Sequence, residues 1–227
     1  MANESALQRA ESPARSLMLT GDRAALIERG RKDLLDLTST ALYEKGEALF
    51  SADGDYTQAA FWFRKSAEQG NAYAQERLGL MHSMGWGVPE DEAASFGWYQ
   101  KAAEAGSARG QFELGFCYRN GIGTKKDDAQ AIIWDLRSAQ QGYARAQSWL
   151  GSVYLGYGER FGVPRDPQES YFWSYLAHEF YTAEKSVLAE STARRRDKAA
   201  SFLTDAALTQ TQDRARKWLA RHFLYLK

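Results

Sequence analysis

The amino-acid sequence predicts an all-α fold in which short helix pairs stack into a superhelical array. Three observations support this prediction. A unit of 36 residues recurs along the chain, each unit carries apolar residues at helical spacing, and only 4 of the 227 residues are proline. A helix pair of this length cannot bury its own apolar face, whereas stacked pairs bury a continuous core.

The repeat is visible in three segments that align without gaps. WFRKSAEQGNAYAQERLG (62–79), WYQKAAEAGSARGQFELG (98–115) and WDLRSAQQGYARAQSWLG (134–151) begin at tryptophans 36 residues apart. A fourth tryptophan, Trp173, follows Trp134 by 39 residues, so three residues have been inserted between them. Aligning GWGVPED with RFGVPRD places the insertion in the turn that precedes Asp166.

Each unit is predicted to hold two helices with recognisable ends. An aspartate stands before the second helix of each unit, where its carboxylate accepts hydrogen bonds from free amides of the first turn. These predicted N-caps are Asp91, Asp127 and Asp166. Glycines stand where the second helix must end and the chain must turn sharply, which suits a left-handed C-cap. They are Gly70, Gly106 and Gly142.

The two ends of the chain depart from the repeat. Residues 1–20 are polar and aperiodic and are predicted to be disordered. Residues 21–54 are predicted to hold N-terminal helices and a degraded first repeat, and the regular array spans 55–181. Residues 182–227 are predicted to form a capping helical pair. Its helices run from Thr182 to about Leu203 and over 205–226, the latter with Ala215, Trp218 and Leu219 on its apolar side.

The order of the repeated residues resembles a known family. The pattern A-x2-LG-x2-Y-x2-G-x-GV-x2-D, followed by A-x3-W-x4-A-x2-G, resembles the Sel-one-like repeat (SLR), a branch of the tetratricopeptide-like helical repeats. Residues 74–106 match closely, with His82 where the family usually has tyrosine. The resemblance covers about residues 40–181. It implies an α/α right-handed superhelix with terminal capping helices, used as a binding scaffold, and it implies no catalytic residues.

The residues themselves give little support to catalysis. The single cysteine, Cys117, shares an apolar column with Met81 and Val153, and the three histidines are scattered. No cluster of histidine and cysteine has metal-ligand spacing, and no cofactor is expected. The Gly-x-Gly elements have helices on both sides, whereas a dinucleotide site needs a preceding strand. An enzyme or a small-ligand binder stays the less favoured alternative.

Partner recognition is predicted on the first helix of each pair, which lines the concave face according to the resemblance. Three columns there vary strongly between units. The candidate partner-binding residues are Glu76, Leu80, Phe112, Phe116, Arg119, Ser148, Ser152 and Leu155. Phe112 and Phe116 are four residues apart and could present an aromatic patch beside Arg119, since aromatic and arginine side chains are common binding anchors. The alternative is that the phenylalanines pack against the neighbouring repeat.

The three-residue insertion is a second candidate site. YGERF (157–161) is predicted to project Tyr157, Arg160 and Phe161 from the edge of the array, where they could contact a partner. The alternative is a solvated loop with Phe161 packed back onto a helix.

The predicted function is a non-enzymatic scaffold or adaptor that binds a protein or peptide through the concave face. By resemblance alone, a narrower role would be a bacterial immunity protein that neutralises a secreted toxin, or a regulator of signalling. Lysine plus arginine and aspartate plus glutamate both number 29, so nucleic acid is not expected as a partner. No signal peptide or membrane span is visible, which predicts a cytoplasmic protein. A homodimer could form through a terminal helical face.

Overall fold

The computed structural model describes residues 38–223, and every regular element in that part of the chain is helical. This confirms the predicted all-α class. A helix over 38–48 continues directly into the π-helical turn η1 (Leu49–Asp53). The helices that follow are α3 (Tyr56–Glu68), α4 (Ala72–Met84), α5 (Glu92–Glu104), α6 (Ala108–Asn120), α7 (Asp128–Gln140), α8 (Ala144–Tyr154), the 3-10 helix η2 (Tyr157–Phe161), α9 (Pro167–Ala183), α10 (Leu188–Ala200) and α11 (Asp205–Phe223). The predictions for residues 1–37 and 224–227 fall outside the described residues.

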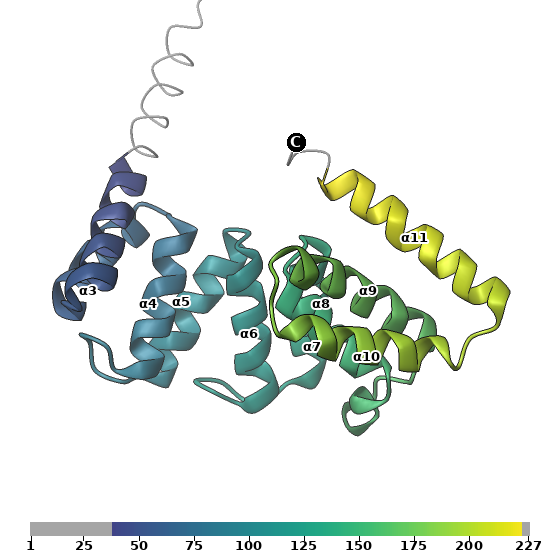
Figure 1. The fold of residues 1–227 in the computed structure, drawn as a ribbon. Coiled ribbons are helices and arrows are strands. Elements are labelled where there is room, and N and C mark those ends of the chain that lie inside the picture. The colour runs from purple at the N-terminus through teal and green to yellow at the C-terminus, as the bar shows by residue number, and fades with distance from the viewer. Residues whose placement is uncertain (1–37, 224–227) are drawn as a thin grey trace, which may run out of the picture.

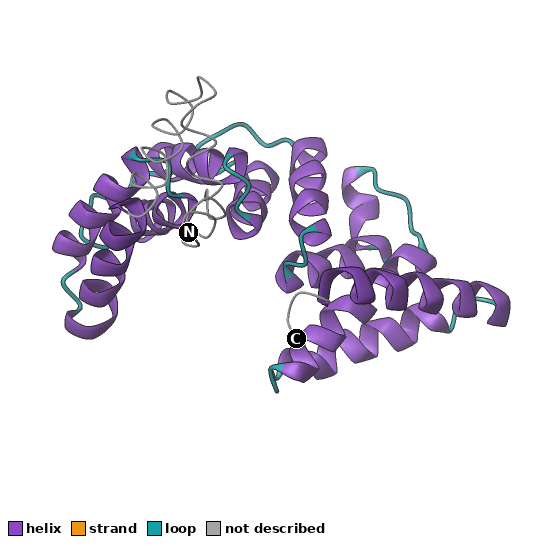
Figure 2. Ribbon diagram, turned by 90° about the horizontal axis from the view of Figure 1, so that it is seen from above, coloured by secondary structure: helices purple, strands orange, loops and turns teal. Residues whose placement is uncertain are grey.

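Successive helices pack side by side along the array (Figure 1). Within the pairs, α4 packs on α5, α6 on α7 and α8 on α9. Neighbouring pairs join through α3 with α4, α5 with α6, and α7 with α8. The view from above shows that the row of pairs curves (Figure 2). None of the helices between residues 38 and 223 combines the length and the hydropathy needed to cross a bilayer.

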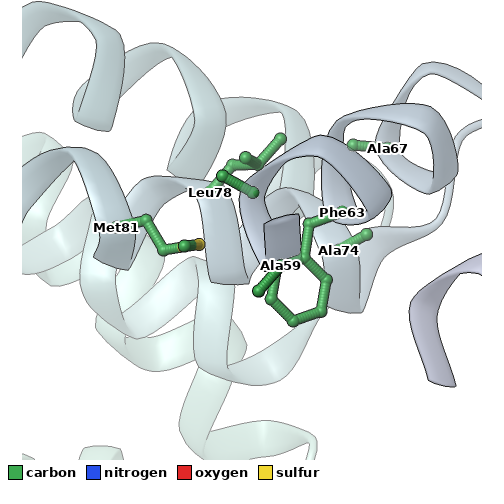
Figure 3. Packing of buried hydrophobic residues seen from close by; sticks show 7 residues of the cluster. Ala59, Phe63, Ala67, Ala74, Leu78 and Met81 are labelled. Carbon is green, nitrogen blue, oxygen red and sulfur yellow. The ribbon is translucent and has the colours of Figure 1, made fainter. Parts of the chain in front are cut away.

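The core at the N-terminal end joins small and large apolar side chains from α3 and α4 (Figure 3). Phe63 of α3 and Leu78 and Met81 of α4 are fully buried, with alanines between them. Ala74, Leu78 and Met81 stand at helical spacing and form one buried face of α4, which confirms the predicted apolar periodicity in this unit. The alanines let the helix backbones approach closely, and the large side chains fill the remaining space.

The predicted helix ends are confirmed at atomic detail. The carboxylates of Asp91, Asp127 and Asp166 accept hydrogen bonds from the backbone amides of Ala94, Gln130 and Glu169 at 2.9–3.0 Å. The capping glycines take left-handed φ angles of 86° at Gly70, 90° at Gly106 and 91° at Gly142. A residue with a Cβ is strained at such an angle, so these turns select glycine.

The helix predicted from Thr182 to about Leu203 is wrong at its start. Helix α9 extends to Ala183, and α10 begins only at Leu188. Tyr181 stands where the other pairs have the capping glycine, and its Cβ favours continuing the helix rather than turning. The chain turns one helical turn later, where Lys185 takes a φ of 52° and Ser186 donates to the carbonyl of Tyr181 at 2.8 Å.

The last helix folds back onto the array. Thr204 caps α11, its hydroxyl accepting from the amide of Ala207 at 3.3 Å. Helix α11 packs on α9, while α10 packs on both α8 and α9. Ala215 of α11 is fully buried, and Trp218 and Leu219 pack against the same core cluster, which confirms the predicted apolar side.

Candidate functional site

A groove of about 810 Å³ runs along the first helices of three successive pairs. We call it the central groove. It is lined by α4, α6 and α8, by the start of α5 and by η2 in the inserted turn. The structure brings together in it the predicted residues Leu80, Phe112, Phe116, Arg119, Tyr157, Arg160 and Phe161. The variable columns and the insertion are thus parts of one surface.

The insertion builds one end of the groove. Its residues fold into η2, which packs on α8: the rings of Trp149 and Tyr157 lie 5.2 Å apart between centroids, and those of Tyr157 and Phe161 lie 5.7 Å apart. The guanidinium of Arg160 stacks over the Tyr157 ring at 3.7 Å. Tyr157 remains 42% exposed. The inserted residues are therefore ordered against α8, while Tyr157, Glu159 and Arg160 remain exposed to solvent.

The two phenylalanines of α6 have different environments. Phe112 is half-buried, with its ring centroid 5.6 Å from that of Tyr143. Phe116, four residues on, is 44% exposed and faces the groove. Each of the two predicted alternatives therefore describes one residue: Phe112 packs against the neighbouring repeat, and Phe116 is open to a partner.

Arg119 is held rigidly at the floor of the groove. Its Nη1 donates to Oδ2 of Asp135 at 2.5 Å, and its guanidinium lies 4.1 Å over the ring of Trp149. Its side chain is only 11% exposed. Asp135 is fully buried, and burial raises the pKa of its carboxyl to about 6, although Arg119 opposes this shift.

Four predicted residues do not line the groove. Glu76 is buried, where it accepts a hydrogen bond from the Ser107 hydroxyl and lies 3.3 Å from Nε of Arg109. Ser148 accepts from Arg195 of α10, through its carbonyl at 2.9 Å and its hydroxyl at 3.1 Å. The other two are Ser152, which bonds back to the Ser148 carbonyl at 3.4 Å, and Leu155 beyond the end of α8.

The residues that line the groove but escaped the sequence-based prediction include Arg109, Glu113, Arg145 and Trp149. Glu113 lies 4.0 Å from both Arg109 and Arg145. Burial raises the pKa of Glu113, an effect that the surrounding arginines oppose. Variation between repeat units, which indicated the predicted residues, could also have found these four, because their columns vary too. One column holds Arg77, Glu113 and Trp149, and the other holds Tyr73, Arg109 and Arg145.

The cysteine and two of the histidines, which could suggest catalysis, are held by contacts within the fold. Burial raises the pKa of the Cys117 thiol to about 12, so it is protonated at neutral pH. Nδ1 of His82 lies 3.2 Å from the carbonyl of Pro89, and Nδ1 of His178 lies 3.0 Å from that of Ala189. Residues 38–223 contain no group of three or more histidine, cysteine, aspartate or glutamate side chains placed to hold a metal ion.

Two solved structures with similar folds are repeat proteins. The crystal structure of c5321, a protective antigen of uropathogenic Escherichia coli with an SLR fold, is 29% identical with a TM-score of 0.66. The match covers 97% of this chain and 45% of that one, so the chain spans less than half the length of the antigen. A Sel1 repeat protein from Oxalobacter formigenes is 29% identical with a TM-score of 0.61, over 79% of this chain and 73% of that chain.

One further solved structure matches more weakly. The immunity protein Pa5087 from Pseudomonas aeruginosa is 17% identical over 79% of this chain and 81% of that chain. Its TM-score of 0.38 is too low to bear on function. No curated protein matches the sequence.

The family comparison covers more than half of the chain. The Sel1 repeat model matches residues 40–71, 72–107, 108–143 and 144–177. Each of the last three matched segments begins at the first residue of a first helix, α4, α6 or α8. The resemblance inferred from the repeated residues is confirmed: the chain belongs to the Sel1 repeat family.

Proposed function

We propose that this chain is a non-enzymatic scaffold that holds a segment of a partner protein in the central groove. Sel1 repeats in general mediate protein–protein interaction. The observation that carries the proposal is the gathering of exposed aromatic side chains and arginines on one hollowed surface. Tyr157 and Arg160 are of the residue types that most often dominate binding energy at protein interfaces, and phenylalanines such as Phe116 are enriched there.

The apolar part of the groove supplies a driving force for binding. Phe116, Tyr157 and Met84 all remain exposed there. Removing apolar surface from water contributes about 25 cal/mol per Å². A partner that covers these three side chains would gain this contribution without any rearrangement of the helices.

The floor of the groove is preorganised. The ion pair with Asp135 and the stacking on Trp149 fix the Arg119 side chain before any partner binds. Side chains that are already ordered lose little conformational entropy on association, which favours affinity. The packing of η2 on α8 fixes Tyr157 and Phe161 in the same way.

Selection from a displayed library of random peptides tests the proposal. We expect the chain to enrich peptides whose affinity falls at least tenfold in the double variant Phe116→Ala, Tyr157→Ala. The matched control is Phe61→Ala, which removes an aromatic side chain of similar exposure from α3, outside the groove. Enriched peptides that bind the double variant and the wild type equally would overturn the proposed site.

The narrower roles named above differ in the partner rather than in the surface. Neutralising a secreted toxin and regulating a signalling protein would both use the central groove. A toxin or secretion gene beside the coding gene favours the first role, and a sensor kinase gene favours the second.

A further inference from the structure

We infer that the bound segment lies along the array with a fixed charge polarity. A basic side chain of the segment faces the α4–α5 end of the groove, apolar or aromatic side chains cover its middle, and an acidic side chain faces η2. This inference rests on the proposed function, because it requires that the groove holds a peptide.

Most charges around the groove are neutralised within the chain. Arg119 pairs with Asp135 at 2.5 Å, and Lys126 pairs with Asp128 at 3.2 Å. Arg109 lies 3.3 Å from Glu76, and Arg145 lies 4.0 Å from Glu113. These pairs leave little net charge in the middle of the groove.

Three lining side chains keep uncompensated charges at the two ends. Glu90 and Glu92 lie in the turn before α5 and at its first residue, and both are exposed. Arg160 lies on η2 and is also exposed. None of the three forms an ion pair with any residue between 38 and 223. The neighbouring acid Glu159 does not line the groove.

A partner that covers these charges must supply opposite ones. A charge that is desolvated without a partner is strongly unfavourable, and like charges brought together discriminate against wrong ligands. The α4–α5 end therefore favours lysine or arginine, and the η2 end favours aspartate or glutamate. Met84 beside the acidic end and Phe116 and Trp149 on α6 and α8 offer apolar contact.

The spacing of the helices sets the length of the segment. Helices in direct contact lie about 8–10 Å apart, so the path from α4 past α6 to α8, which are joined mainly through α5 and α7, spans at least roughly 20 Å. An extended chain covers about 3.3 Å per residue. The basic and acidic side chains should therefore stand at least about six residues apart.

Peptide selection with charge-swapped variants tests this polarity. The wild type should enrich peptides with a basic residue at least about six positions from an acidic one and apolar residues between them. In peptides selected by the triple variant Glu90→Lys, Glu92→Lys, Arg160→Glu, the basic and the acidic residue should exchange places relative to the wild-type peptides. This holds for either direction of the bound peptide chain. Exchanging the two end charges of a wild-type peptide should weaken its binding about tenfold to the wild type and restore binding to the triple variant.

The control and the contrary outcomes separate this inference from the proposed function. The variant Glu104→Lys, Arg137→Glu changes exposed charges that do not line the groove, and it should select the wild-type pattern. Peptides that need Phe116 and Tyr157 but show no charge order, or the same order with the triple variant, would overturn the polarity alone. Peptides that do not depend on the groove at all would overturn the proposed function.

Discussion

The first two helix pairs and the last two differ in the side chain that packs between their helices. In each of the first helices a glycine faces one side chain of the second helix. In the N-terminal half these side chains are Phe63 and Tyr99, opposite Gly46 and Gly79. In the C-terminal half they are Asp135 and Ser174, opposite Gly115 and Gly151. One column of the repeat therefore changes from aromatic to polar halfway along the chain.

The difference shows how the array makes room for a site. Where Tyr99 fills the space between α4 and α5, burial against neighbouring helices is the stabilising contribution. At Asp135 the small carboxylate lets Arg119 enter, and the guanidinium in turn supports Trp149 at the floor of the groove. The ion pair thus supports the floor of the groove from below, while Tyr99 of the same column lines the groove directly.

The turns show the same contrast. Gly87 and Gly123 have φ angles of 67° and 65°, and each presses against the backbone at the start of the preceding second helix, at Tyr56 and Glu92 respectively. Gly162 stands at the equivalent point after the insertion, and a methyl group there would meet nothing within 4 Å. Two turns therefore hold neighbouring pairs together, and the third is free to form η2.

Removing the arginine of the buried pair should have the largest effect. Arg119→Met keeps the aliphatic stem but leaves the buried Asp135 carboxylate without its ionic partner. Breaking a buried pair from one side costs about 3–5 kcal/mol, so the free energy of unfolding should fall by that amount at neutral pH. Urea denaturation followed by circular dichroism measures it.

The double variant Arg119→Met, Asp135→Leu sharpens this result. Replacing a buried ion pair by apolar residues is often neutral or stabilising, so most of the lost stability should return. If the single variant is as stable as the wild type, the ion pair does not stabilise this half of the array.

The pH dependence of stability should report the buried Asp135 carboxyl of the C-terminal half. The pKa of Asp135 rises from 3.8 to about 6 on folding, so the folded state binds its proton more tightly. Stability from this group is therefore highest below about pH 4 and falls as the pH rises to about 6, by about 3 kcal/mol in total. The difference in unfolding free energy between wild type and Asp135→Asn, measured from pH 4 to 7, should show this slope. A flat difference would contradict the raised pKa.

The aromatic half can be tested at its glycine. A methyl group at Gly79 would lie 2.7 Å from the Tyr99 ring, so Gly79→Ala should lower the unfolding free energy by about 2 kcal/mol through overpacking. The matched control is Gly97→Ala in the interior of α5, where a methyl group meets nothing within 4 Å. That control should stabilise the protein by about 0.5–1 kcal/mol, because alanine has the higher helix propensity. Equal effects of the two variants would mean that the close contact does not matter.

The repeat period, the helix class and most helix ends could be predicted from the sequence, because they depend on local chemistry. Apolar spacing, capping aspartates and capping glycines act within a few residues of the chain. The exception at Thr182 has the same origin, since replacing a capping glycine by Tyr181 moves the turn to Lys185. Four matched repeats then determine the stacking of pairs.

Only the tertiary structure decided which variable residues meet. Glu76 and Phe116 both stand in variable columns, yet one is buried beside Ser107 and the other is exposed in the groove. The hydrogen bond of Arg195 to Ser148 joins residues that are 47 positions apart in the sequence. The sequence by itself determined a Sel1 array with candidate residues on its first helices. The packing of neighbouring pairs decided which of those residues face solvent, because each side chain's exposure depends on helices that its own repeat does not encode.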